Sequence, residues 1–156
     1  MVRGPRIAAA VGASVAAVAS PPNHDYLLSL GTSEVFDYHA ADWAQQVRAV
    51  VPGGVDLLFD GAGGQTRDRA LDAVRDGGRA MSIVLQDTPL PLARGITGES
   101  FAARGGRPRL EQLAALVDAG QLRPQAETVL PLEQAREALA RVAAGHTRGK
   151  IALHIG

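Results

Sequence analysis

The sequence predicts an α/β fold built on a doubly wound parallel sheet. Short apolar runs alternate with amphipathic stretches of about 8–14 residues, which is the pattern of strands joined by crossover helices. Glycines and prolines stand at the ends of these stretches, where helices and strands stop. Residues 55–64, V-D-L-L-F-D-G-A-G-G, form an apolar run that ends in a carboxylate and a glycine-rich turn. In open α/β sheets, ligands bind outside strand ends of this kind.

The composition indicates a single globular domain and excludes several classes of function. The chain has 156 residues, of which 46% are hydrophobic, so it can bury a core. Its 16 basic and 16 acidic residues balance, which gives no electrostatic basis for binding nucleic acid or an anionic membrane. Cysteine is absent, so there is no disulfide framework and no thiolate metal site. No apolar stretch approaches the length of a membrane span, and we expect a cytoplasmic protein.

The first half of the chain predicts three strands and three helices. Apolar runs give the strands, and helical periodicity with a closing glycine or a Pro-Gly-Gly stop gives the helices. In chain order these are a helix at 5–11, a strand at 14–19, a helix from 22 or 23 to 30, a strand at 34–38, a helix at 41–51 and a buried strand at 55–60.

The second half continues this alternation after one interruption. Residues 86–108 lack clear periodicity, which is typical of a binding loop or lid, although 96–101 could form a short strand. The remaining predicted elements are a helix at 66–75, a strand at 79–85, an amphipathic helix at 109–119, a strand at 125–130, a helix at 131–144 and a strand at 150–155.

Four motifs, in order, resemble passages of the medium-chain dehydrogenase/reductase superfamily, and most of all its zinc-independent NADPH:quinone oxidoreductase and enoyl reductase branch. Residues 20–38 are similar to "S-x-x-N-x-D … LGAD-V-x-DY", and residues 55–64 to "VD-V-x-D-x-x-GG". Residues 77–83 match "GGR-x-V-S-I", and residues 130–151 are similar to "PLE-x-A … G-HTRGK-I". The resemblance covers nearly the whole chain and implies a Rossmann-like domain.

The chain also departs from that family. The resemblance implies that residues 1–156 are a single truncated Rossmann-like domain, without the family's GroES-like catalytic domain. The first strand and its glycine-rich, pyrophosphate-binding loop are missing as well, so we expect weak or absent NADPH binding. In the family that strand lies between those equivalent to 14–19 and 55–60. The strands on either side must therefore pair directly or pair with a strand of a second chain, and we expect a homodimer.

The resemblance implies a cofactor-binding set at the carboxyl ends of the strands: Ser20, Asn23, Gly61, Gly63, Gly64, Ser82 and Ile83. In NADP-preferring relatives, polar side chains in the turn of Ser20 and Asn23 contact the 2′-phosphate. These two residues could equally cap the next helix, and no basic residue lies in their turn. NADP is thus a possible cofactor, and no metal site is expected because His146 and His154 lack spaced partners.

Three residues are candidates for acid–base chemistry. Asp60 ends the central strand and is either a partly buried acid or base, or a turn residue that accepts hydrogen bonds from the glycine backbone. Tyr38 and His39 follow another strand, and His39 is either a proton-transfer group or a solvated loop histidine. Among other polar residues, Asp37 caps or orders its turn, Asp42 follows the same strand, and His24 lies on a helix surface. Arg148 and Lys150 either meet an anion or are solvated charges, and the irregular loop over the cleft contains Gln86, Asp87 and Glu99.

Three functions remain open for a protein that binds a small-molecule ligand. One is the cofactor-binding half of an NADP-dependent quinone or enoyl oxidoreductase, in which the cofactor supplies the hydride. Another is a non-redox enzyme, such as a cyclase, isomerase or dehydratase of secondary metabolism, with its substrate in the former cofactor cleft. The third is a non-catalytic remnant or partner subunit.

Overall fold

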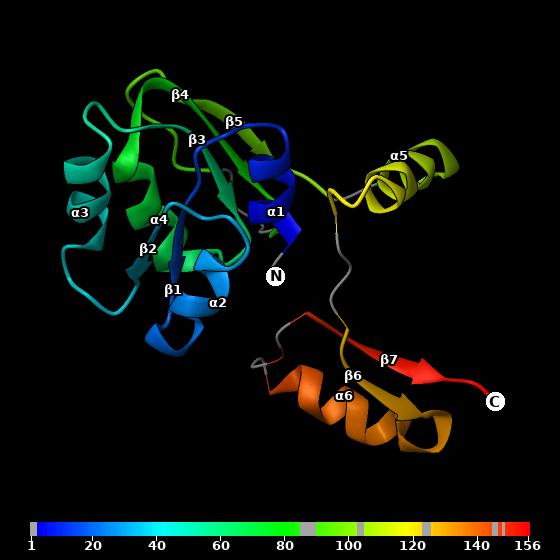
Figure 1. Cartoon of the computed structure of the whole chain (residues 1–156). Helices are drawn as coiled ribbons and strands as arrows, with labels where there is room; N and C mark the ends of the chain where they lie inside the picture. Colours follow the sequence, from blue (N-terminus) through cyan, green and yellow to red (C-terminus); the bar gives the residue numbers. More distant parts are fainter. Residues whose placement is uncertain (1–2, 85–89, 103–104, 123–125, 145–146, 148) are drawn as a thin grey trace.

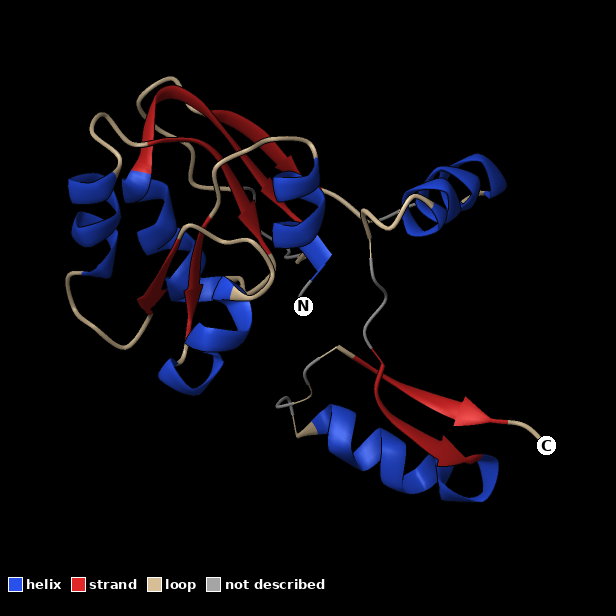
Figure 2. Cartoon of the chain, in the orientation of Figure 1, coloured by secondary structure: helices blue, strands red, loops and turns tan. Residues whose placement is uncertain are grey.

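The protein is an α/β structure in which every strand pair is parallel (Figures 1 and 2). The computed structural model describes residues 3–84, 90–102, 105–122, 126–144, 147 and 149–156. Its elements are α1 (Arg3–Ala10), β1 (Ala16–Ala19), η1 (Pro21–Asn23), α2 (His24–Leu28), β2 (Glu34–Asp37), α3 (Trp43–Val50), β3 (Val55–Asp60), α4 (Gly64–Ala73), β4 (Val74–Ser82), β5 (Thr97–Ser100), α5 (Arg107–Asp118), β6 (Ala126–Pro131), η2 (Leu132–Gln134), α6 (Ala135–Ala143) and β7 (Lys150–His154). The predicted α/β class and strand–helix alternation are confirmed.

The strands form three separate sheets rather than one continuous wall. Their orders are β1-β2, β3-β4-β5 and β6-β7. In the described part of the chain β1 and β3 do not pair, so the break falls where the sequence predicted a missing strand. The possible short strand at 96–101 is present as β5.

One hydrophobic core nevertheless joins the first two sheets. Trp43 and Val47 of α3 and Ala70 of α4 are buried in one cluster, against which Val18 of β1 and Leu58 of β3 pack. The helices α3 and α4 therefore cover the same face of both sheets. The sheets are two halves of one layer, held by side chains rather than by a backbone ladder across the break.

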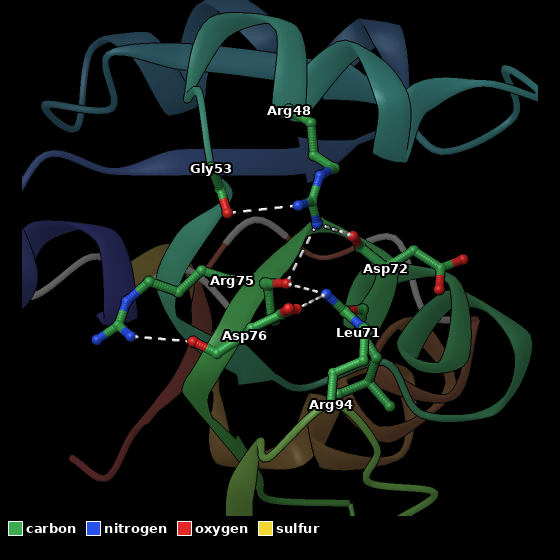
Figure 3. Close-up of polar contacts among 8 residues, drawn as sticks. Arg48, Gly53, Leu71, Asp72, Arg75, Asp76 and Arg94 are labelled. Atoms are coloured by element: carbon green, nitrogen blue, oxygen red, sulfur yellow. Dashed lines mark hydrogen bonds and ion pairs between the residues drawn. The ribbon is translucent and has the colours of Figure 1, made fainter.

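The boundary between α4 and β4 differs from the prediction of a helix at 66–75 and a strand from 79. The helix ends at Ala73, and the strand begins at Val74. Two arginines from elsewhere in the chain bind the carbonyl oxygens around this junction (Figure 3). A helix needs donors for its last carbonyls, and these guanidinium groups supply them.

Arg94 and Arg48 both donate hydrogen bonds to these carbonyl oxygens. The Arg94 guanidinium donates to the carbonyl oxygens of Leu71 at 2.6 Å and Val74 at 2.9 Å. The Arg48 guanidinium donates to the carbonyl oxygens of Asp72 at 2.7 Å and Val74 at 3.3 Å. Because both arginines lie far from the junction in sequence, local periodicity could not have indicated where the helix stops.

The sheet is less covered than the sequence predicted. On β3, Leu57 is 54% and Phe59 49% exposed, so the strand expected to be buried has one uncovered face. The apolar face of α5 is also uncovered: Leu110 is 64% exposed, and no described residue of this helix is buried. Figure 1 shows α5 standing away from the β3-β4-β5 sheet, which accounts for the exposure of its apolar face.

The last three major elements form a small unit of their own. In Figure 1, β6, α6 and β7 lie together and apart from the other two sheets. Ala138 of α6 is buried, whereas Leu139 and Val142 are exposed. None of the described helices combines the length and the apolar character that crossing a bilayer requires.

Candidate functional site

The predicted site residues gather at the carboxyl ends of two strand pairs. Ala19 of β1 is in register with Asp37 of β2, and Asp60 of β3 is in register with Ser82 of β4. Parallel strands end at a common edge, so the residues that follow each pair are neighbours. We define the β1–β2 corner as Ser20, Asn23, His24, Asp37, Tyr38 and His39, and the Asp60 turn as Asp60, Gly61, Ala62, Gly63, Gly64, Ser82 and Ile83.

Both carboxylate oxygens of Asp60 are occupied within its turn. Oδ1 accepts hydrogen bonds from the backbone N–H groups of Ala62 and Gly63, both at 2.9 Å. Oδ2 accepts a hydrogen bond from the Ser82 hydroxyl at 2.6 Å. Asp60 is 5% exposed and Ser82 is fully buried. This is the geometry of a carboxylate that organises its turn and links β3 to β4.

The glycines of the same turn open the first turn of α4 to ligands. Gly63 has φ 72° and Gly64 has φ 54°, values that side chains other than glycine rarely adopt. A methyl group on Gly64 would meet no heavy atom within 4 Å apart from those of its chain neighbours. No side chain caps α4, and the Ile83 N–H donates to the Asp60 carbonyl at 3.0 Å. Backbone N–H groups exposed at a helix start are suited to anionic ligands.

Ser20 and Asn23 bind each other rather than cap a helix. The Asn23 side-chain amide donates to the Ser20 hydroxyl at 3.0 Å, and the Asn23 backbone N–H donates to the Ser20 carbonyl at 2.9 Å. Neither side chain makes a helix-capping hydrogen bond. The pair forms a small polar patch where β1 ends.

Asp37 and His39 form a hydrogen-bonded pair where β2 ends. Asp37 Oδ1 lies 2.8 Å from His39 Nδ1 and accepts the His39 backbone N–H at 3.0 Å. The Tyr38 ring lies against the His39 ring, with centroids 4.1 Å apart. The His39 backbone hydrogen bond is the largest cause that lowers the pKa of Asp37, with smaller contributions from the His39 and His24 rings, while partial desolvation opposes them.

His24 is a member of this corner that the sequence prediction assigned only to a helix surface. Its Nε2 lies 3.1 Å from the Ala19 carbonyl oxygen, and the residue is half-buried at the start of α2. Because Ala19 is the register partner of Asp37, this contact places His24 at the same strand edge as that carboxylate. The signal in the sequence is the absence of any lysine or arginine between Arg6 and Arg48, which leaves histidines as the only cationic side chains there.

The remaining candidate residues lie outside these two clusters. Asp42 accepts a hydrogen bond from the Gln46 side chain at 3.0 Å, and Glu99, Lys150 and His154 are exposed on strands. Gln86, Asp87, His146 and Arg148 lie outside the described residues. Within the described ranges, no group of three or more His, Asp or Glu side chains is arranged to hold a metal ion.

Comparison with known proteins assigns this arrangement to a family of oxidoreductases. The model of the zinc-binding dehydrogenase family matches residues 30–153. The mitochondrial NAD(P)H oxidoreductase RTN4IP1 is 30% identical in Mus musculus and 28% identical in Homo sapiens; each alignment covers 92% of this chain and 42% of the relative. The chain thus spans less than half the length of these curated relatives.

Solved structures share the fold over nearly the whole chain. An NAD-dependent alcohol dehydrogenase superposes with a TM-score of 0.86 at 28% identity, covering 99% of this chain and 48% of that one. The quinone oxidoreductase of Coxiella burnetii superposes with a TM-score of 0.81 at 23% identity, covering 99% and 49% respectively. The second likeness concerns the fold alone.

Proposed function

Because this chain belongs to the zinc-binding dehydrogenase family of the medium-chain dehydrogenase/reductase superfamily, we propose that it is the cofactor-binding part of an NAD(P)H-dependent oxidoreductase. The observation that carries this proposal is the grouping of the β1–β2 corner and the Asp60 turn at the carboxyl ends of parallel strands on either side of one break. This is where an open α/β sheet binds a dinucleotide.

The residues at this edge fit such a ligand. Ser20 and Asn23 offer a hydroxyl and an amide to the adenosine ribose, and the Asp60 turn offers exposed backbone to the rest of the molecule. When bound, the nicotinamide ring supplies or accepts the hydride. The role of Asp60 and Ser82 is to hold Gly61, Gly63 and Gly64 in shape, and Ile83 lies beside them through its bond to the Asp60 carbonyl.

We expect this chain alone to bind the dinucleotide weakly. In a complete dinucleotide fold, a central strand and its glycine-rich turn grip the pyrophosphate. No strand lies between β1 and β3 in the described chain, so that grip is not provided here. A homodimer or another partner could supply the neighbouring strand, and a cytoplasmic location remains a prediction.

Two-dimensional amide NMR with NADPH titrated to about 1 mM tests the proposal. We expect weak, saturable shifts confined to the β1–β2 corner and the Asp60 turn. Shifts absent at that concentration, or confined to β6-α6-β7, would contradict it. A micromolar dissociation constant would keep the oxidoreductase function but refute the weak binding.

A second candidate function is a non-redox enzyme of the cyclase, isomerase or dehydratase type. The observation in its favour is the Asp37–His39 pair, because the His39 side chain is 62% exposed and its Nδ1 is held by a carboxylate. Such an imidazole can present Nε2 to a substrate as a general base or acid. If the chain converts a substrate without any dinucleotide, and His39→Gln removes the pH dependence of that rate, this function is supported over the first.

A further inference from the structure

The β1–β2 corner lies in a stretch of the chain that has no lysine or arginine. Residues 7–47 contain no lysine or arginine, and this stretch includes β1, α2 and β2. It does contain four carboxylates: Asp25, Glu34, Asp37 and Asp42. The only side chains in it that can become positive are His24 and His39. A histidine changes charge between about pH 8 and pH 5, so the net charge of this stretch depends on pH.

Both histidines lie at the common strand edge, and His39 contacts the Asp37 carboxylate. His39 Nδ1 lies 2.8 Å from Asp37 Oδ1, and His24 Nε2 lies 3.1 Å from the Ala19 carbonyl oxygen. Ala19 and Asp37 are register partners, so Ser20 and Tyr38, the next residues along, leave the sheet side by side. A group bound at Ser20 therefore lies at the same edge as His24, Asp37 and His39.

We propose that His24 and His39 determine the preference of this site between NADPH and NADH, an inference that rests on the proposed function. With both imidazoles neutral, the corner presents carboxylates, which favour a ribose with a free 2′-hydroxyl and repel a 2′-phosphate. With both imidazoles protonated, the corner presents two cationic donors that a 2′-phosphate can accept from. The preference for NADPH over NADH thus rises as the pH falls.

The groups around the corner do not remove this dependence. The Tyr38 ring lies against the His39 ring at an angle of 35°, and Asp25 and Asp42 are exposed carboxylates that keep the corner negative at higher pH. From the packed helix α4, the Arg69 guanidinium donates to the carbonyls of Ala40 at 2.7 Å and Ala41 at 2.9 Å. Its charge is permanent, so it contributes a constant background rather than a pH response.

The test measures binding of NADPH and NADH to the chain at about pH 6 and about pH 8 by calorimetry. Adenosine 2′,5′-bisphosphate and AMP serve as a second pair of probes, because they differ by the same 2′-phosphate and lack the nicotinamide. In the wild-type chain we expect the affinity ratio of phosphorylated to unphosphorylated ligand to be about fivefold higher at the lower pH.

A double variant, H24Q/H39Q, is the matched control. A 2′-phosphate takes up a proton itself near pH 6, and this control experiences the same ligand titration without the histidines. Its affinity ratio should rise only slightly at the lower pH, because a phosphate that carries less negative charge is repelled less by the remaining carboxylates. Asp37→Asn, which keeps the acceptor for the His39 backbone N–H, should raise the affinity ratio of phosphorylated to unphosphorylated ligand at pH 8.

Two results would overturn the inference in distinguishable ways. If both ligands bind but the wild-type ratio follows the double variant at both pH values, the histidines do not set the preference and the proposed function stands. If no ligand of either pair binds at either pH, the proposed function fails and this inference fails with it. Unchanged circular dichroism and thermal unfolding of the variants establish that they are folded.

Discussion

The Ser82 hydroxyl donates a 2.6 Å hydrogen bond to Oδ2 of Asp60, and both residues are buried where β3 and β4 end side by side. This bond joins the second sheet to the turn that opens α4. It completes the set of donors around a buried carboxylate, whose other oxygen is already bound by two backbone N–H groups.

Replacing Ser82 with alanine should lower the free energy of unfolding by about 1.5–3 kcal/mol, because it leaves a buried carboxylate oxygen without its donor. Urea denaturation measures the change. Ser100→Ala is the matched control: Ser100 is the register partner of Ser82 on β5, and its buried hydroxyl has no hydrogen-bond partner among the described residues. Equal losses in the two variants would show that the Asp60 bond is not the cause.

Replacing Arg94 with alanine should lower the free energy of unfolding by about 2–4 kcal/mol. Its guanidinium donates to the carbonyls of Leu71 and Val74 and to Asp76 Oδ1 at 2.8 Å, so several acceptors lose a donor at once (Figure 3). Arg107→Ala is the control, since that side chain is 90% exposed and forms an ion pair within α5, to Glu111. The control should change stability by less than about 0.5 kcal/mol in the same denaturation experiment.

Gly63→Ala should cost about 1–3 kcal/mol of stability, and Gly64→Ala about 1 kcal/mol. Gly63 has φ 72° and ψ −171°, a backbone conformation that is essentially confined to glycine, whereas the φ of 54° at Gly64 lies in the left-handed region that alanine can enter at smaller cost. Thermal unfolding orders the two variants. The opposite order would mean that the Asp60 turn does not hold the conformation described.

The pKa of Asp37 in the folded chain should lie below its ordinary value of 3.8 in a carbon-detected NMR titration. The stabilisation from its charged form is present above that ordinary value and is lost as the pH falls through the lower, folded-state pKa. Because the largest cause is the His39 backbone N–H, the pKa of Asp37 should stay below its ordinary value in His39→Ala. A return to the ordinary value in that variant would assign the effect to the imidazole instead.

The sequence predicted the elements well where their signals are local. The strand at 55–60 and the helices closed by Gly12, Gly31 and Gly120 follow from apolar periodicity and from glycines that take up positive φ. The break between β1 and β3 also followed from the motifs, because the missing strand left a gap of known position. These features depend on neighbours in the chain.

What the sequence did not predict depends on distant contacts. The end of α4 is determined by Arg48 and Arg94, which reach it from other elements. The exposure of Leu110 follows from where α5 lies, which no local pattern encodes. His24 was not grouped with Asp37 because only the pairing of β1 with β2 brings them to one corner.

The break between β1 and β3 leaves two rows of main-chain amides and carbonyls without a neighbouring strand in the described chain. Such rows are templates to which any extended peptide can add. We therefore predict that copies of this chain add to one another, strand by strand, in concentrated preparations. A short apolar peptide that bound in the gap between β1 and β3 would block this association. It would leave the hydrophobic core shared by the two sheets unchanged.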